Sequence, residues 1–446
     1  MEIRRAFLSW FARATQPEEE GIHWSLRWAF IALIVLFPVV FPLSSRANNV
    51  CFFLLFGLSL IVVLTRRRLR GATFFQFLWT HKMLCLLSVC ALFAVFLNQL
   101  MVAGFRARDY DMPFHFFALP FLIYALSALG WKDLRHIQWG WFVSVLLSCA
   151  VYVFSAVQLD TWRFSGVRSY ATLLIIPFVN QGLLTACLVF LTTSWDRAKS
   201  RILFFLRCLV GLLGVALCVL SGNRGGWLLF PFIVWIVYVA FPHVGTRKKM
   251  TVIVVGVCVV LAFFFVSDSV RERVRLVGEE ITQYTEGGNR NTSIGFRLQW
   301  YRAAPTLIAQ HGLFGMGEQH YDRRIQEQDF VSRGVWTEEA KDPAHFHNDF
   351  LQWMILYGMV GGVFALLLWG VPLCYFFRHI RSTSPILRGA ALMGVLLGIA
   401  YAVFGLTDAF TSTSRDGKLL ANYYVLTFSV LLAILLEKRH YPAKLG

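Results

Sequence analysis

The sequence predicts an all-α polytopic membrane protein with about twelve transmembrane helices and one large helical loop on the outer side. Three observations lead to this fold class. Hydrophobic residues make up 57% of the 446 residues, the apolar residues run in long unbroken stretches, and the basic residues gather in every second connection between those stretches. The first two observations argue against a soluble globular protein, and the third sets the orientation of the helices.

The apolar stretches define the expected helices. A hydrocarbon core about 30 Å thick needs about 20 apolar residues in one helix. We expect each of the following stretches to form one membrane-spanning helix: 24–43, 48–65, 83–104, 113–130, 139–159, 171–194, 202–222, 226–242, 250–267, 349–377, 389–408 and 419–436.

The distribution of charge sets the topology. The net charge is +17, and lysines and arginines are concentrated after the second, fourth, sixth, eighth and tenth stretches and at the end of the chain. Cytoplasmic loops of membrane proteins carry such an excess of Lys and Arg. Both termini are therefore expected in the cytoplasm. Topology, together with contact to anionic membrane lipids, accounts for the positive charge without a nucleic-acid partner.

The chain divides into three parts. Residues 1–267 hold nine helices, and near the N-terminus apolar residues such as Ile3 and Trp10 are mixed with arginines, which predicts a short interfacial helix. Residues 268–348 form the large outer loop. Residues 349–446 hold three more helices and a cytoplasmic tail. All nine cysteines fall within predicted helices, so we expect neither a disulfide framework nor a cysteine metal site.

The outer loop is the one long connection, and loops of this length are usually functional or disordered. Its sequence is not of low complexity. Residues 297–309 fit an amphipathic helix, the glycine-rich turn 312–317 follows, and residues 318–328 can form a second helix. We therefore expect a folded cap over the helical bundle.

A histidine stands where this loop meets the tenth helix. His347 and Asn348 precede the apolar stretch that begins at 349, so an imidazole is expected at the boundary between water and lipid. Imidazole is the only side chain whose unperturbed pKa lies near neutral pH, and His347 can therefore take up and release a proton there. Asn348 is a good capping residue for the helix. The structural alternative is that His347 only caps or packs the helix end.

Two arginines are candidates for binding an anion. Arg224 lies in residues 221–227, the break between the seventh and eighth helices, on the same outer side as His347. Polar groups at membrane depth are functional candidates because they are costly to insert, and the glycines after Arg224 would leave backbone amides open to an oxyanion. Arg297 begins the amphipathic helix. Two guanidinium groups suit a diphosphate because each offers paired donors. The alternatives are an arginine that reaches lipid headgroups and an ordinary surface arginine.

Other polar residues on the outer side can join this site, although each is also explained as a charge or cap at the membrane boundary. They are Arg163, Arg168, Asn223, Arg302, His345, Asn348 and Asp408. His345 and His347 form a His-x-His pair, which can bind a metal. A zinc site needs three or four ligands, however, and no HExxH motif or outer cysteine supplies the others, so we expect no metal.

Three motifs in combination resemble the O-antigen ligase and polymerase superfamily of bacterial envelopes. Each motif is weak alone, but their order and the long loop before the histidine make the combination fairly specific. The resemblance is good over residues 221–362. Asn223 stands where the family often has serine and Gly312 where it often has proline, and neither difference removes a charge. In chain order the motifs are 223–227, Phe296–Arg297 through the turn 312–317, and His347–Asn348 with Leu351 and Gly358.

The resemblance implies a GT-C-like, metal-independent glycosyltransferase of the bacterial inner membrane, with no cofactor and with an active site that faces the periplasm. The donor would be a glycan linked to undecaprenyl diphosphate. In the ligase branch the acceptor would be a sugar hydroxyl of lipid A-core. Arg224 and Arg297 would bind the diphosphate, and His347 would accept the proton of the attacking hydroxyl. An in-line attack would invert the anomeric configuration.

Several other functions are alternatives. An O-antigen polymerase shares the donor chemistry but often has two comparable outer loops, whereas this chain has one dominant loop, which favours the ligase. A protein O-oligosaccharyltransferase of the same superfamily commonly carries a further domain after its last helices. A multi-span transporter or lipid-linked flippase is the alternative of a different class. Secondary transporters usually show internal repeats, and we find none in this sequence.

Overall fold

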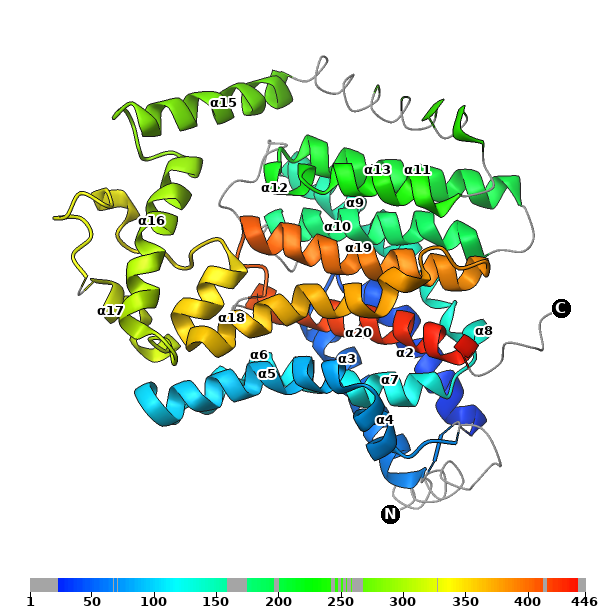
Figure 1. Cartoon of the computed structure of the whole chain (residues 1–446). Helices are drawn as coiled ribbons and strands as arrows, with labels where there is room; N and C mark the ends of the chain where they lie inside the picture. The colour runs from blue at the N-terminus through cyan, green and yellow to red at the C-terminus, as the bar shows by residue number, and fades with distance from the viewer. Residues whose placement is uncertain are drawn as a thin grey trace.

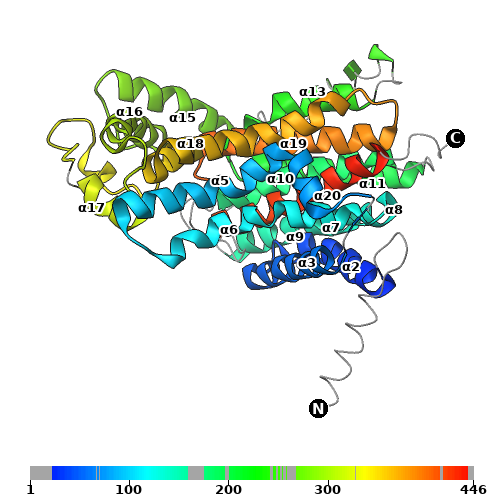
Figure 2. The same ribbon diagram turned by 60° about the horizontal axis from the view of Figure 1, so that its bottom comes forward.

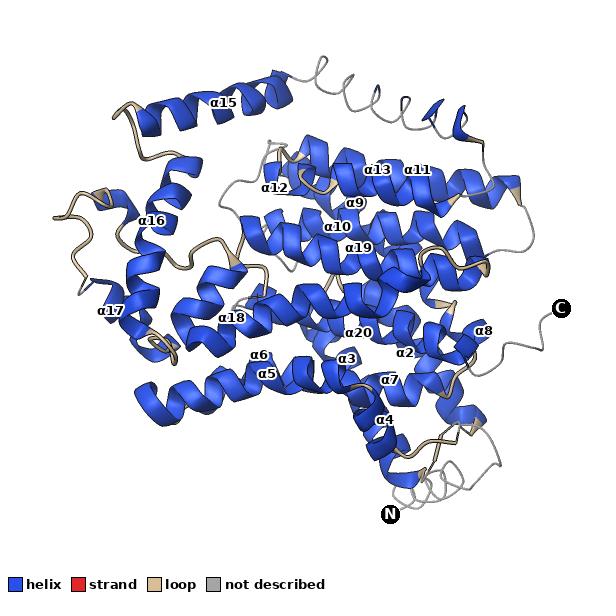
Figure 3. Ribbon diagram, in the orientation of Figure 1, coloured by secondary structure: helices blue, strands red, loops and turns tan. Residues whose placement is uncertain are grey.

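The structure is a computed structural model. It describes residues 23–439 apart from 67, 70, 159–174, 196–199, 242–244, 327, 412–414 and most of 248–267. Within these residues every regular element is a helix and no strand forms (Figure 1, Figure 3). The prediction of an all-α fold is confirmed. The expected interfacial helix near the N-terminus lies outside the described residues.

Eight helical segments of the described chain are long and apolar enough to cross a membrane. Their main helices are α3 (Ser45–Thr65), α5 (Lys82–Asn98), α9 (Ile137–Gln158), α10 (Ile175–Leu191), α11 (Arg201–Leu220), α18 (Asp349–Phe376), α19 (Pro385–Thr407) and α20 (Arg415–Arg439).

The other four expected spans are shorter, broken or outside the described residues. The first is the shorter apolar helix α2 (Trp24–Val40), and the eighth is the short apolar segment Arg224–Ala240. The stretch 113–130 forms two helices because Pro120 begins a new one, having no N–H to continue the previous turn. The stretch 250–267 is largely undescribed, so the number twelve stays a prediction. The helices in question are α6 (Asp111–Phe117), α7 (Leu119–Ser127), α12 (Arg224–Trp227) and α13 (Phe230–Ala240).

Three helices form the interior of the bundle. In the most apolar part of α20 all residues are buried, and in α10 and α19 the buried shares are 83% and 78%. By contrast, only 33% is buried in α11, where Phe205 and Leu212 are exposed. A helix that exposes large apolar side chains is expected where lipid surrounds the protein. Of these three helices α19 packs against α18, and the two run side by side in both views (Figure 1, Figure 2).

The glycine-rich turn after α16 binds to a break in α18. Inside α18, Gly358 has φ 66°, which leaves the carbonyls of Ile355 and Leu356 without helical partners. The turn uses them: the N–H groups of Met316 and Gly317 donate to these carbonyls at 2.8 and 2.9 Å. A Cβ atom on Gly358 would lie 2.0 Å from a backbone oxygen of the turn. This contact joins the second and third sequence motifs in space.

The outer loop is folded at one end of the bundle. It contains α15 (Asp268–Thr285), α16 (Ser293–His311) and α17 (Tyr321–Gln326) (Figure 1, Figure 2). The amphipathic helix expected at 297–309 is α16, which begins earlier because the Thr292 side chain caps it by accepting from Gly295 N at 3.0 Å. The second expected helix, at 318–328, is only the short α17 preceded by a tighter turn.

Candidate functional site

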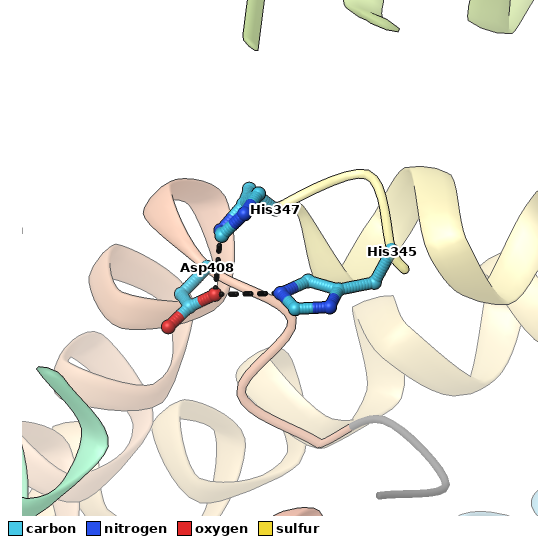
Figure 4. Close-up of side chains that lie close together, drawn as sticks. All are labelled: His345, His347 and Asp408. Atoms are coloured by element: carbon cyan, nitrogen blue, oxygen red, sulfur yellow. Dashed lines mark hydrogen bonds and ion pairs between the residues drawn. The ribbon is translucent and has the colours of Figure 1, made fainter. Parts of the chain in front are cut away.

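Two histidines and an aspartate meet at the loop end of α18. His347 Nδ1 lies 2.8 Å from Asp408 Oδ1, and His345 Nε2 lies 3.2 Å from the same oxygen (Figure 4). Both histidines lie in the segment before α18, and Asp408 is the first residue after α19. The packing of α18 against α19 therefore brings together groups that are 61 residues apart in the chain.

The backbone at His347 is held in an unusual conformation. Its φ is 49°, in the left-handed region that non-glycine residues rarely adopt. The Asn348 side chain caps α18 by accepting from Leu351 N at 3.1 Å, and the Tyr301 hydroxyl donates to the His347 carbonyl at 2.9 Å. These bonds on either side compensate the local strain, which is a common feature of functional residues. The expected capping role of Asn348 is confirmed.

Aromatic contacts fix the plane of the His347 ring. Trp300 of α16 stacks on it, with ring centroids 5.4 Å apart and planes 10° apart, and the His345 ring lies 4.2 Å away. The Trp300 indole N–H donates to the Ala340 carbonyl at 3.0 Å, which holds the indole in turn. His347 Nε2 makes no hydrogen bond to the residues that the structure describes. The ring is thus oriented through Nδ1, and Nε2 is left for another partner.

The electrostatics favour a neutral imidazole beside an ionised carboxylate. Burial lowers the pKa of His347, and the hydrogen bond that His347 donates to Asp408 opposes this effect only in part. Burial would raise the pKa of Asp408, but the hydrogen bonds from His345 and His347 outweigh it and hold that pKa well below its usual range. His347 then donates its Nδ1–H to the carboxylate, and its Nε2 lone pair can accept a proton.

A second buried carboxylate fixes the segment that carries Asp408. Asp349 is the first residue of α18, and its Oδ1 accepts from Thr411 N at 2.7 Å. A Cβ atom on Gly405 of α19 would lie 2.7 Å from Asp349 Oδ2, so only a glycine allows this approach. The Asp408 carboxylate also accepts from Ala409 N at 2.9 Å. Asp349 at the start of α18 therefore packs against Gly405 near the end of α19 and is hydrogen-bonded to the segment that follows α19.

Arg224 lies beside this site but is bound to another residue. It begins α12, and a Cβ atom on the next residue, Gly225, would lie 2.7 Å from Thr407 Oγ1, one residue before Asp408. The guanidinium Nη2 of Arg224 lies 3.2 Å from Glu280 Oε1 of α15, and the Arg224 side chain is only 19% exposed. Arg224 is thus held in the protein and not extended among lipid headgroups.

The glycines after Arg224 lie at helix contacts, and the openness of their backbone amides to an oxyanion stays a prediction. A Cβ atom on Gly226 would lie 2.5 Å from Cys218 Sγ, and a Cβ atom on Gly225 would meet Thr407 of α19. Their small size permits helix packing. Asn223 takes part in the same packing, since its amide donates to Asn180 Oδ1 at 2.6 Å, and it does not contact the histidines.

The remaining candidates differ in position. Arg297 on α16 is close enough to the histidines that its charge lowers the pKa of His347. Arg302 is exposed on the same helix. Arg163 and Arg168 lie outside the described residues. We did not predict Glu280 or Asp349 from the sequence, and we expected Trp300 only as an interfacial anchor or packing residue. The amphipathic spacing of α16 was the only signal for Tyr301.

The two histidines and Asp408 also form a three-ligand donor set, since their ligand atoms all lie within 4.8 Å of one another. Imidazole nitrogen and carboxylate oxygen are ligands that zinc accepts. However, both histidine nitrogens approach the same carboxylate oxygen at hydrogen-bond distance. The three side chains therefore already form a triad in which both histidines are hydrogen-bonded to Asp408.

Part of the chain is similar to known proteins. Residues 209–366 match a family model described as O-antigen ligase, and this segment includes Arg224, Arg297 and His347. An uncharacterised protein of Haemophilus influenzae is 24% identical over 201 residues, which cover 45% of this chain and 50% of that protein. The chain thus matches about half the length of this relative.

Proposed function

We propose that this chain, whose residues 209–366 match the O-antigen ligase family, is a membrane glycosyltransferase of the ligase and polymerase type. In this proposal it transfers a glycan from undecaprenyl diphosphate to a sugar hydroxyl of lipid A-core. The observation that carries the finer proposal is the His347–Asp408 hydrogen bond of 2.8 Å, which leaves Nε2 of a neutral imidazole available as a base.

In the proposed reaction, His347 Nε2 removes the proton from the attacking hydroxyl. The hydroxyl oxygen forms a bond to the anomeric carbon, and the bond from that carbon to the diphosphate oxygen breaks. Undecaprenyl diphosphate leaves with the electron pair, and the proton remains on His347. Asp408 stabilises the imidazolium that forms, as the carboxylate does in other His–Asp pairs. General-base catalysis of this kind contributes about 10²–10⁴-fold in rate.

The leaving diphosphate gains negative charge as its bond to the sugar breaks. Arg224 and Arg297 supply positive charge for it, because guanidinium groups form paired, charge-assisted hydrogen bonds with phosphate oxygens. Because these arginines can supply the positive charge, we propose that the reaction needs no metal. The attacking and leaving oxygens would be on opposite sides of the anomeric carbon, which inverts its configuration.

The proposed site faces the periplasm of a bacterial inner membrane. This orientation follows from the positive charge of alternate connections, which assigns both termini to the cytoplasm. The prenyl chain would then lie against the exposed apolar side chains of the outer helices, with the diphosphate at the boundary near the start of α18.

A deletion strain tests the proposed function, and a lipopolysaccharide gel separates it from that of a polymerase. We expect loss of long glycan on the lipid A-core while the lipid-linked glycan accumulates. Core that carries a single repeat unit would instead identify a polymerase. Unchanged lipopolysaccharide would reject both.

A further inference from the structure

Glu280 is a buried carboxylate on an otherwise exposed, charged helix. The neighbouring charges of α15 lie at the surface, where Arg275 pairs with Glu272 and Glu279, whose side chains are 47% and 44% exposed. The Glu280 side chain is only 9% exposed. Its two partners lie on α12 and α16, which belong to separate parts of the fold (Figure 1).

The carboxylate of Glu280 binds two groups at once. Its Oε1 lies 3.2 Å from Arg224 Nη2, and its Oε2 accepts from Ile294 N at 2.9 Å, in the first turn of α16. A buried carboxylate is costly unless it is paired in this way. Arg297 follows Ile294 by three residues on α16. Glu280 therefore binds the guanidinium of Arg224, one proposed diphosphate ligand, and the backbone of the helix that carries Arg297, the other.

These two partners are the groups that proteins use to bind phosphate. Guanidinium groups bind phosphate and carboxylate oxygens in the same geometry. The N-terminal amides of a helix bind phosphate, sulfate and carboxylate alike. The carboxylate of Glu280 therefore has the chemistry of one phosphoryl group of a bound diphosphate.

We propose that Glu280 is an internal competitor of the donor, which occupies part of the diphosphate site and must leave Arg224 and Ile294 when the donor binds. This inference rests on the proposed role of Arg224. It has two consequences. Donor binding moves at least the Glu280 side chain, and with it the contact of α15 to α16. After transfer, the returning carboxylate helps to displace the diphosphate product.

The alternative role for Glu280 is a fixed support that orients Arg224 for the donor. The two roles predict opposite signs. Removal of a competitor tightens donor binding, whereas removal of a support weakens it. Glu280→Gln separates them because the amide keeps the shape of the side chain and loses its negative charge.

The experiment uses the full-length protein in nanodiscs and measures the binding of inorganic pyrophosphate, together with KM and kcat for the lipid-linked donor. For Glu280→Gln we expect pyrophosphate binding to tighten and the donor KM to fall by about tenfold or more, since tenfold is the lower end for a single charge-assisted contact. We expect kcat to stay level or fall, because the product leaves more slowly. Glu279→Gln is the matched control, since it removes an exposed charge from the same helix, and it should leave binding unchanged.

A second variant guards against misfolding. Glu280→Asp keeps the charge but shortens its reach, and it should also tighten pyrophosphate binding. If Glu280→Gln, Glu280→Asp and Arg224→Ala all bind pyrophosphate more weakly, Glu280 is not a competitor. That result would leave the proposed function intact. Binding that is insensitive to Arg224→Ala would instead reject Arg224 as a diphosphate ligand, and the inference about Glu280 with it.

Discussion

The pairing of His347 with Asp408 makes a quantitative prediction for Asp408→Asn. The amide keeps the size of the side chain, and its oxygen can still accept a hydrogen bond from His347 Nδ1. In the unaltered protein His347 Nδ1 lies 2.8 Å from Asp408 Oδ1. Only the negative charge is lost. The transition state contains an imidazolium, and a hydrogen bond to a charged group is worth about 1.5–3 kcal/mol. We therefore expect kcat to fall by about 10- to 150-fold.

The pH dependence of Asp408→Asn has a definite sign. Transfer requires unprotonated His347, so activity rises as pH rises through the pKa of His347. The Asp408 carboxylate raises that pKa against the lowering effect of burial. Without the charge the pKa falls further, and the acid limb of kcat/KM should move to lower pH while the plateau drops.

The assay is transfer by purified protein between pH 5 and 9 with saturating acceptor. Asp111→Asn is a matched control because Asp111 is another carboxylate in an ion pair, with Lys418, and it should leave the profile unchanged. An unchanged plateau in Asp408→Asn, or an acid limb that moves to higher pH, would refute the role of this pair.

Three further predictions concern the anion site, the metal and the loop contact. Arg224→Lys and Arg297→Lys should retain part of the activity that the alanine variants lose, because lysine keeps the charge without the paired donors; full activity in either alanine variant would exclude that arginine from the site. A chelator should leave transfer unchanged, and a loss that one divalent cation restores would show that the histidines and Asp408 hold an ion. Gly358→Ala should lower the melting temperature, because Gly358 has a φ of 66° and a Cβ atom there would lie 2.0 Å from the Leu313 carbonyl oxygen. The backbone conformation alone should cost about 1–3 kcal/mol of stability. Gly370→Ala is the control on the same helix, and it should have little effect because its Cβ atom would meet open space.

The features that can be predicted from sequence are the local ones. Asn348 before a long apolar stretch predicts a capped helix, and the cap is present. The spacing of apolar residues predicts α16. Both signals depend on residues within a few turns of one another, where the helical period alone determines which side chains share a face.

The pairing of His347 with Asp408 could not be predicted in this way, although Asp408 was among the candidate residues. Asp408 follows an apolar stretch, and a charge at a helix end is equally consistent with exposure to water and with burial beside an imidazole. The choice depends on how α18 packs against α19. Glu280 is similar, because it lies among the alternating charges of α15 and only its burial distinguishes it. For Gly225 and Gly226, the sequence suggests an open turn, and the approach of α19 and Cys218 fills the space.

The most direct test of His347 as the base is single-turnover transfer by His347→Ala, measured together with donor binding on the same preparation. We predict that transfer slows by about 10²–10⁴-fold, and that donor binds as tightly as to the unaltered protein because Arg224 and Arg297 remain. Transfer at the original rate would contradict the assignment of His347 as the base.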